Sequence, residues 1–267
     1  KLKMGVAGAA LATDISQAIS VVVSFLWLCT RMKKMKTQQK SRIFDLHILE
    51  IVCNVAVPSM LQQSMVSIGI FLVQRLVNGY GEAVMAGYAA ATKIDSIAIL
   101  PMVNVGNAVS TFTAQNIGAG KPERVKRGFR SGLIMALLVA LSFTAVYCFL
   151  SSGVLTLFMD TASVQAMQAG TDFLRIVTPF YLFIAVKLMA DGILRGAGAM
   201  KCFMVATFTD LVLRVVLAYL FSAEQGARGI WMSWPAGWVI ASVLSCVFYF
   251  TGVWIPKRFR ISFRQKT

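Results

Sequence analysis

The sequence predicts an all-α, polytopic membrane protein with seven transmembrane helices. Hydrophobic residues make up 57% of the 267 residues and charged residues only 14%, whereas about a quarter of the residues of a typical soluble domain are charged. The mean hydropathy is +0.71. The apolar runs are much longer than the roughly ten residues of a transmembrane strand and lack its alternation. Helices are the expected spans, because a helix satisfies its own backbone hydrogen bonds in lipid.

Seven apolar segments have the roughly 20 residues that a helix needs to cross the hydrocarbon core of a bilayer. They are residues 5–28, 48–76, 83–116, 129–151, 172–195, 202–222 and 229–254. The connections after the odd-numbered spans are basic, whereas those after the even-numbered spans carry almost no positive charge. The basic residues are Arg31, Lys33, Lys34, Lys36, Lys40 and Arg42 after the first span, Lys121, Arg124, Lys126, Arg127 and Arg130 after the third, Arg195 and Lys201 around the fifth-to-sixth connection, and Lys257, Arg258, Arg260, Arg264 and Lys266 at the end.

Positive charge close to the ends of spans marks the cytoplasmic side of a membrane protein. The loops 31–47 and 117–128 and the carboxyl-terminal tail are therefore predicted to be cytoplasmic. The net charge of +15 is then explained by topology and by contact with anionic membrane lipid. No basic stretch is interleaved with aromatic residues in the way that single-stranded nucleic acid requires, so no nucleic-acid partner is expected.

The stretch STFTAQNIGAGKPERVKRGFR, residues 110–130, places glycines next to a lysine and so invites comparison with a phosphate-binding loop. The spacing excludes that motif, because Gln115 and Pro122 stand where it needs glycine and Ser or Thr. The better interpretation is that Gly118 and Gly120 end a long helix at the inner surface.

The first and last spans of the chain resemble each other, and this likeness predicts an organisation in lobes. The first begins with Gly5-Val6-Ala7-Gly8 and the last with Gly226-Ala227-Arg228-Gly229, and about twenty apolar residues and then basic ones follow each. Both resemble the closing helix of a unit, and duplicated units are common in transporters. The expected organisation is a last helix of a truncated amino-terminal lobe (1–30), a basic cytoplasmic connector (31–46), a six-helix lobe (47–256) and a basic cytoplasmic tail (257–267).

Six strings carry a resemblance to a known family, in the same order and spacing. They are GVAGAALATDISQ, VPSMLQQSMVSIGIFLVQRLVNGYG, YAAATKIDSIAILPM, STFTAQNIGAGKPERVKRG, GILRGAGAM and GIWMSWPAGW. Together they resemble the multidrug and toxic compound extrusion (MATE) family over nearly the whole chain, from that family's sixth helix through its carboxyl-terminal lobe.

This resemblance implies twelve helices in two lobes of six around a central cavity, in the inner or plasma membrane of the cell. It implies an antiporter that exports organic, often cationic, compounds in exchange for H⁺ or Na⁺. The expected partners are membrane lipid, small organic substrates and the missing amino-terminal lobe, and a coupling ion takes the place of a cofactor. Some members carry carboxylates where this chain has Gln63-Ser64-Met65-Val66-Ser67 and the segment 181–186, so a Na⁺ site of that kind is not expected in this lobe.

Charged residues inside spans are candidates for transport chemistry, because a charge in hydrocarbon costs about 2.5–3.5 kcal/mol on insertion scales. Lys93 and Asp95 lie two residues apart on the third span, so they point to different faces of the helix. Pro101 is expected to kink that helix and to free a backbone carbonyl. Asp95 is a candidate for taking up a proton or a cation beside the kink. The alternative is that both charges pair with neighbouring helices for structural reasons.

Two further groups of charges follow helical spacing. Lys187, Asp191 and Arg195 on the fifth span are spaced four residues apart, and an aspartate between two cations is expected to stay ionised and to serve structure or gating. Asp210 and Arg214 on the sixth span are expected to form a structural ion pair. Asp14 on the first span has no partner within its own helix and would face the missing lobe.

Neutral polar residues crowd the second span, with Gln62 and Gln63 near its mid-depth. At least one of these amides should line the cavity or bond to another helix, because an unsatisfied amide in lipid is costly. The five cysteines are scattered without a C-x-x-C spacing, so neither a metal site nor a disulfide is expected. No arrangement of acid, base and nucleophile indicates an enzyme.

Two other classes of function compete with the antiporter. A lipid-linked-saccharide flippase of a related fold would use a cationic cavity for a pyrophosphate, and Lys93, Lys187 and Arg195 are compatible with one. A seven-helix receptor is disfavoured, because its first helix would require an external amino terminus, and the sequence shows neither an exported leader nor an extracellular domain before that helix.

Overall fold

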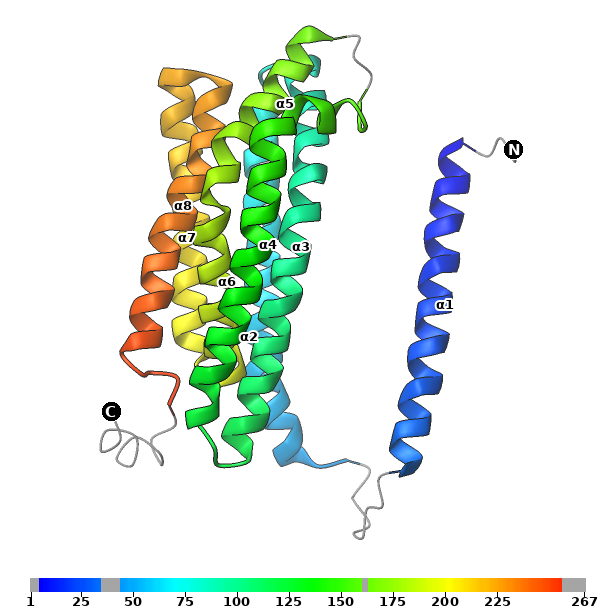
Figure 1. Cartoon of the computed structure of the whole chain (residues 1–267), viewed down its shortest axis with the longest axis vertical. Helices are drawn as coiled ribbons and strands as arrows, with labels where there is room; N and C mark the ends of the chain where they lie inside the picture. The colour runs from blue at the N-terminus through cyan, green and yellow to red at the C-terminus, as the bar shows by residue number, and fades with distance from the viewer. Residues whose placement is uncertain (1–4, 35–43, 160–162, 256–267) are drawn as a thin grey trace. The chain divides into compact units, whose positions relative to one another are not determined.

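The computed structural model describes residues 5–34, 44–159 and 163–255, and these residues form helices joined by short turns (Figure 1). The predicted all-α fold is confirmed. The chain divides between Leu49 and Glu50 into two units, of which the first contains α1 (Gly5–Lys34) and the second contains a helical bundle. The predicted connector 31–46 lies partly, and the predicted tail 257–267 wholly, outside the described residues.

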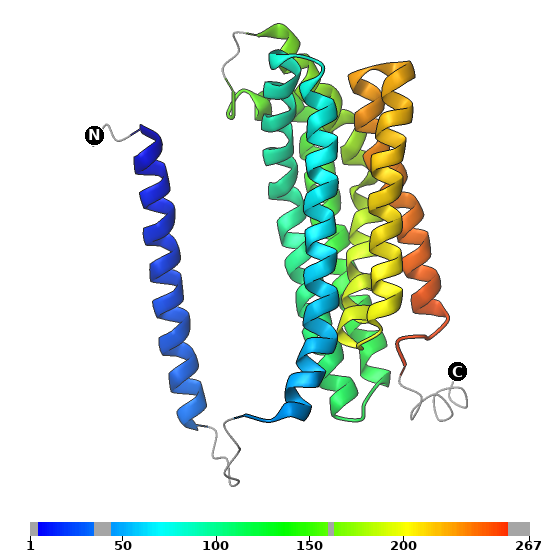
Figure 2. The same cartoon turned by 180° about the vertical axis from the view of Figure 1, so that it is seen from behind.

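The helices after α1 are α2 (Leu46–Asn78), α3 (Glu82–Gly118), α4 (Glu123–Leu155), α5 (Val164–Val177), α6 (Tyr181–Gly196), α7 (Met200–Gln225) and α8 (Ala227–Phe250), with a short 3-10 helix η1 (Thr178–Phe180) between α5 and α6. Within the described residues, seven helical segments are long and apolar enough to cross a membrane, and Val164–Gly196 counts as one of them. The predicted number of spans is therefore confirmed. Helix α2 lies beside α7 on the face seen in Figure 2, where Gly69 of α2 faces the side chain of Leu211.

The fifth span differs from its prediction as a continuous helix over 172–195. The helical segment begins at Val164, and η1 interrupts it at Thr178–Phe180. Pro179 is the physical reason, because proline has no backbone N–H to continue the hydrogen-bond pattern of the preceding helix and favours the first turn of a new one. The interruption makes Tyr181 the first residue of α6.

The turn between α3 and α4 ends α3 in the way that its glycines predict. Gly120 adopts the left-handed conformation, with φ of 73°. Its N–H donates to the carbonyl of Ile117 over 3.1 Å, and the N–H of Lys121 donates to the carbonyl of Asn116 over 2.8 Å. These two bonds form a Schellman motif, which satisfies carbonyl groups that the helix end would leave unpaired.

Glycines allow α3 and α6 to approach backbone to backbone. Gly192 of α6 lies against the carbonyl group of Gly106, and Gly196, one turn later, lies against the carbonyl group of Ser110. The G-x-x-x-G spacing of these two residues is the small-residue pattern that lets membrane helices pack closely. The crossing fixes α6 directly against the helix that carries Asp95.

We expect Gly192→Ala to destabilise the bundle and Gly153→Ala to stabilise it. A Cβ atom at residue 192 would lie 2.6 Å from the carbonyl oxygen of Gly106, whereas a Cβ atom at residue 153 would meet nothing within 4 Å. Overpacking costs about 1–3 kcal/mol, while alanine is favoured over glycine in a helix by about 1 kcal/mol. Thermal unfolding of both variants in the same detergent measures the difference. A Gly192→Ala protein as stable as the parent would contradict this packing.

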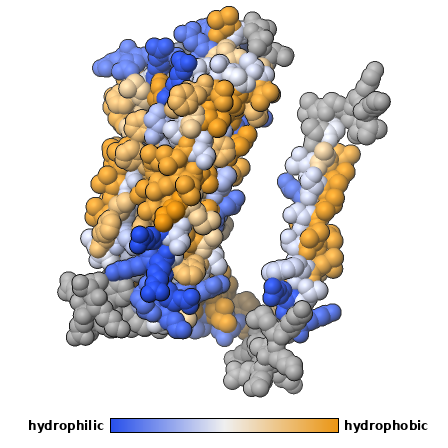
Figure 3. Space-filling view, in the orientation of Figure 1, coloured by the Kyte–Doolittle hydropathy of each residue, from blue (hydrophilic) through white to orange (hydrophobic). Residues whose placement is uncertain are grey.

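The surface of the bundle has the polarity of a membrane protein. Figure 3 shows hydrophobic residues over its middle height and hydrophilic residues gathered towards its ends. The turn around Gly120, with the basic residues that follow it at the start of α4, lies at one end of α3, and the turn at Gly79 lies at the other.

Cysteines introduced at Gly79 and Ala119 are expected to label from opposite sides of the membrane. Both residues are exposed, and α3 separates them. The basic residues after Ala119 predict that this turn is cytoplasmic, so a membrane-impermeant maleimide is expected to react in intact cells with a cysteine at position 79 only. The background protein has its five native cysteines replaced. Equal labelling of both positions in intact cells would refute the predicted topology.

Candidate functional site

Asp95 is buried inside the bundle on the face of α3 that packs against α6. Its residue exposure is 4%, and Ile94 and Ala98 beside it are fully buried. The hydroxyl of Tyr181 donates a hydrogen bond of 2.7 Å to Oδ1 of Asp95. No cation among the described residues lies within ion-pair distance of this carboxylate. A buried carboxylate that has no ion-pair partner is suited to exchange a proton or a cation.

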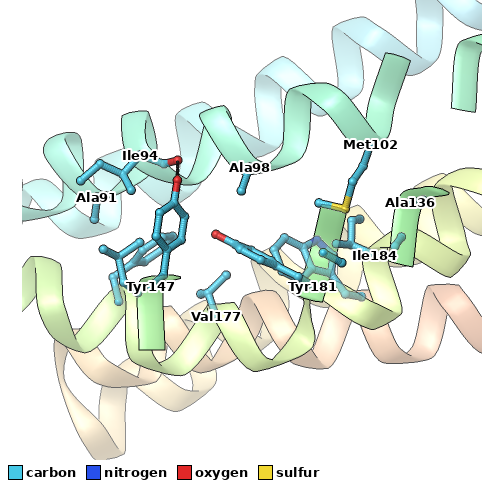
Figure 4. Close-up of a cluster of buried hydrophobic side chains, with 14 of the residues drawn as sticks. Ala91, Ile94, Ala98, Met102, Ala136, Tyr147, Val177, Tyr181 and Ile184 are labelled. Carbon is cyan, nitrogen blue, oxygen red and sulfur yellow. Dashed lines mark hydrogen bonds between the residues drawn. The ribbon is translucent and has the colours of Figure 1, made fainter. Parts of the chain in front are cut away.

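Two tyrosines from different helices reach the turn of α3 that carries Asp95. Figure 4 shows Tyr147 of α4 and Tyr181 of α6 extending towards α3, with the bond from the Tyr147 hydroxyl to the carbonyl oxygen of Ile94, a distance of 2.9 Å. Their rings lie edge to face, with 6.3 Å between the ring centres. The sequence did not reveal either residue, because a tyrosine inside an apolar segment looks like an ordinary core residue. The turn before α6, created by Pro179, is the one local signal that marks Tyr181.

Lys93 lies on the opposite side of α3 and is exposed, as expected from its spacing to Asp95. It belongs to an exposed polar stripe that runs along α3 and consists of Lys93, Ser96, Asn104, Asn107 and Thr111. The intervals of three, eight, three and four residues keep these side chains on one face of a helix. A charged and polar stripe along a transmembrane helix faces water or another protein rather than lipid. Of the five residues of this stripe, only Lys93 stands out in the sequence, because it is a charge inside a span.

The two glutamines of α2 have different surroundings. Gln62 is half-buried and lines a cavity in the bundle together with Lys187, Asp210 and Arg214, whereas Gln63 is exposed. Asp14 is exposed on α1, which belongs to the other unit.

Four charged side chains of α6 and α7 form one buried chain of alternating sign. Nζ of Lys187 lies 2.7 Å from Oδ2 of Asp191 and 3.9 Å from Oδ2 of Asp210. Asp210 in turn accepts hydrogen bonds of 3.1 Å from Nη2 of Arg214 at both of its oxygens. The hydroxyl of Ser245 on α8 donates to Oδ1 of Asp191 over 2.7 Å. The chain thus connects three helices, and its two positive and two negative charges balance.

Arg195 departs from the predicted stripe of three charges. Its Nη2 donates a hydrogen bond of 2.6 Å to Oδ1 of Asn107 on α3 instead of pairing with Asp191. Asp191 therefore forms an ion pair with Lys187 but not with Arg195, whose charge acts on it from beyond ion-pair distance. The second partner of Asp191 is Ser245 from α8, which the spacing within a single helix could not reveal.

Metal-ligating side chains do not gather in the described part of the chain, where no three His, Cys, Asp or Glu residues are placed to hold one ion. The five cysteines, all described, are free thiols.

Comparisons with known proteins agree with the fold and the sequence motifs. The family model MatE matches residues 58–220. The probable multidrug resistance protein YpnP of Bacillus subtilis is 29% identical over 253 residues, which cover 94% of this chain and 56% of that protein. Multidrug and toxin extrusion protein 1 of Homo sapiens is 24% identical over 260 residues, which cover 93% of this chain and 43% of that protein.

Solved structures show the same arrangement of helices. An outward-facing multidrug resistance MATE family transporter of the MOP superfamily matches with a TM-score of 0.81 and 25% identity, over 100% of this chain and 58% of that one. A MOP superfamily transporter from Pyrococcus furiosus matches with a TM-score of 0.83 and 23% identity, over 94% of this chain and 57% of that one. The chain spans about half the length of the curated relatives it matches. These comparisons do not favour the flippase alternative.

Proposed function

This chain belongs to the MatE family, and from that premise we propose that it is the carboxyl-terminal half of a secondary active antiporter that exports organic, often cationic, compounds in exchange for H⁺ or Na⁺. In this proposal residues 47–256 form one lobe of the transporter in the cell membrane. Residues 1–30 supply the last helix of the other lobe, and the basic residues 31–46 connect the two. The names of these relatives, which describe multidrug resistance and toxin extrusion, support the class of substrate.

The observation that carries the proposal is the buried carboxylate of Asp95, which has a tyrosine hydroxyl and no cation as its partner. Antiport needs a group inside the membrane that binds the coupling ion in one state and releases it in another. Of the three buried acids among the described residues, Asp191 and Asp210 are held by Lys187 and Arg214, which leaves Asp95 as the buried acid available for that task.

The polar stripe of α3 supports the part of the proposal that requires a second lobe. The exposed ammonium of Lys93 and the exposed amide of Asn104 in this stripe need an aqueous or protein neighbour within the depth of the membrane. A central cavity between two lobes supplies that neighbour and gives organic cations a path. The basic ends of the spans contact anionic lipid on the cytoplasmic face.

The proposal is tested by efflux of a fluorescent organic cation from vesicles. Vesicles carrying a protein with both lobes are given a Na⁺ gradient and a pH gradient separately, and we expect one of them to drive efflux. Vesicles carrying residues 1–267 alone are expected to show no gradient-driven efflux. Efflux by the 267-residue chain alone would refute the two-lobe proposal, and the lack of any response to either gradient in the two-lobed protein would refute antiport.

A further inference from the structure

A pocket of about 630 Å³ opens at the end of the bundle where α4 ends and α5 begins. Its lining includes Ser152 and Thr156 at the end of α4, Val164 and Met167 of α5, and Arg228 at the start of α8. This end of α4 lies away from the basic turn that precedes the helix, so the predicted topology puts the pocket on the outer side of the membrane. A space of this size accepts an organic group rather than a single ion.

The charged side chains that line this pocket do not balance. Nε of Arg228 donates to Oδ2 of Asp172 over 2.9 Å, and the two charges of this pair cancel. Arg175 also lines the pocket and is exposed, and no acid among the described residues forms an ion pair with it. One accessible guanidinium therefore faces the pocket without a counter-ion.

Arg175 belongs to a segment that crosses the membrane. The segment Val164–Gly196 has 33 residues, which make a helix about 50 Å long, and this exceeds the hydrocarbon core by about 20 Å. With the excess shared between the two ends, Arg175, about 16 Å along the helix from Val164, lies just below the level of the lipid phosphates. An arginine at that depth extends its side chain to the headgroups.

The surface around the pocket is apolar. Phe149, three residues before Ser152, is 87% exposed, and Leu157 and Val164 are each 81% exposed. Figure 1 shows α4, α5 and α8 on the face turned towards the viewer, whereas α2 lies on the face seen in Figure 2. Large apolar side chains that are this exposed on a membrane protein contact lipid, so an occupant from the bilayer finds apolar neighbours for its acyl chains here.

We propose that this pocket binds an anionic phospholipid of the outer leaflet, with its phosphate on the guanidinium of Arg175. A guanidinium can bind two phosphate oxygens at once. The bond to Asp172 uses only Nε of Arg228, so the Nη nitrogens of Arg228 can donate to the same headgroup. A zwitterionic lipid gains less, because Asp172 is already engaged and no other acid lines the pocket for a choline group. The proposal does not depend on Asp95 or on transport.

The preference between two phospholipids is measured beside the pocket. A cysteine at position 153, where a Cβ atom meets nothing within 4 Å, carries a fluorophore in the 267-residue chain with its five native cysteines replaced. Brominated phosphatidylcholine in the vesicles quenches the fluorophore, and it is diluted with unbrominated phosphatidylglycerol or, for comparison, with unbrominated phosphatidylcholine. Phosphatidylglycerol is expected to displace the quencher with about fivefold preference, the effect of one arginine near a membrane surface. Equal recovery of fluorescence with the two lipids would overturn the proposal.

Two variants locate the preference. Arg175→Gln is expected to abolish it. Arg75→Gln is the matched control, because Arg75 is exposed in the last turn of α2, at the same end of the bundle, and does not line the pocket. An unchanged preference in Arg175→Gln, or an equal loss in Arg75→Gln, would overturn the proposal.

Glycerol phosphate dissolved in the aqueous phase distinguishes a lipid from a soluble phosphate. It carries the same phosphate but no acyl chains, so it is expected to leave the quenching by brominated phosphatidylcholine unchanged. If it restored fluorescence as phosphatidylglycerol does, the pocket would be a site for a soluble phosphate ester and the assignment to lipid would be wrong.

Discussion

Replacing Asp95 with asparagine is expected to remove gradient-driven efflux while leaving folding intact. Asparagine has nearly the same shape and can still accept the hydrogen bond from Tyr181, which is 2.7 Å long in the parent protein. It cannot take up a proton or balance a cation. In vesicles with the two-lobed protein, efflux per molecule should fall to the level of protein-free vesicles.

The same substitution at Asp172 provides the control. Asp172 forms an ion pair of 2.9 Å with Arg228, whose side chain is 60% exposed, and exposed pairs contribute at most about 1 kcal/mol. Asp172→Asn should therefore transport like the parent when efflux is normalised to protein in the membrane. Normal transport per molecule by Asp95→Asn would end the case for a coupling role of this carboxylate.

Replacing Asp191 with asparagine is expected to reduce the amount of folded protein. The change leaves the buried ammonium of Lys187 with one distant counter-ion, Asp210 at 3.9 Å, and it weakens the bond that Ser245 of α8 donates. Breaking one side of a buried ion pair typically costs about 3–5 kcal/mol. Thermal unfolding in detergent and the yield of monodisperse protein measure this loss.

A double variant separates the loss of a charge from the loss of packing. Lys187→Met combined with Asp191→Leu removes both members of the pair, and replacing a buried pair by apolar residues of similar volume is often neutral or stabilising. The double variant should recover most of the stability that Asp191→Asn loses. If the double variant is as unstable as the single one, the ion pair is not the cause.

The number of spans and the local ion pairs could be predicted from the sequence because both depend on neighbours along the chain. A run of apolar residues is long enough to cross the membrane whatever surrounds it, and a pair such as Asp210 and Arg214 is brought together by one turn of helix. The different exposure of Lys93 and Asp95 also follows from helical spacing.

The contacts between helices could not be predicted in the same way. The hydroxyl of Ser245 reaches Asp191 across the α6–α8 interface, and the side chain of Arg195 bonds to Asn107 on α3. Neither distance along the chain nor hydropathy carries that information. Pro179 is visible in the sequence, but the hydropathy of the span does not predict the interruption of the helix there. An average of hydropathy over a span does not register a missing backbone hydrogen bond.

The balance of charge within the bundle determines how it responds to an electric field. The chain formed by Lys187, Asp191, Asp210 and Arg214 sums to zero, so a membrane potential exerts no net force on it. Among the buried charged side chains of the described residues, Asp95 alone has no partner of opposite sign. Moving one elementary charge through 100 mV is worth about 2.3 kcal/mol. Among the buried side chains of the described bundle, Asp95 is therefore the charge on which a membrane potential exerts a net force, and that force vanishes when the carboxylate is neutral.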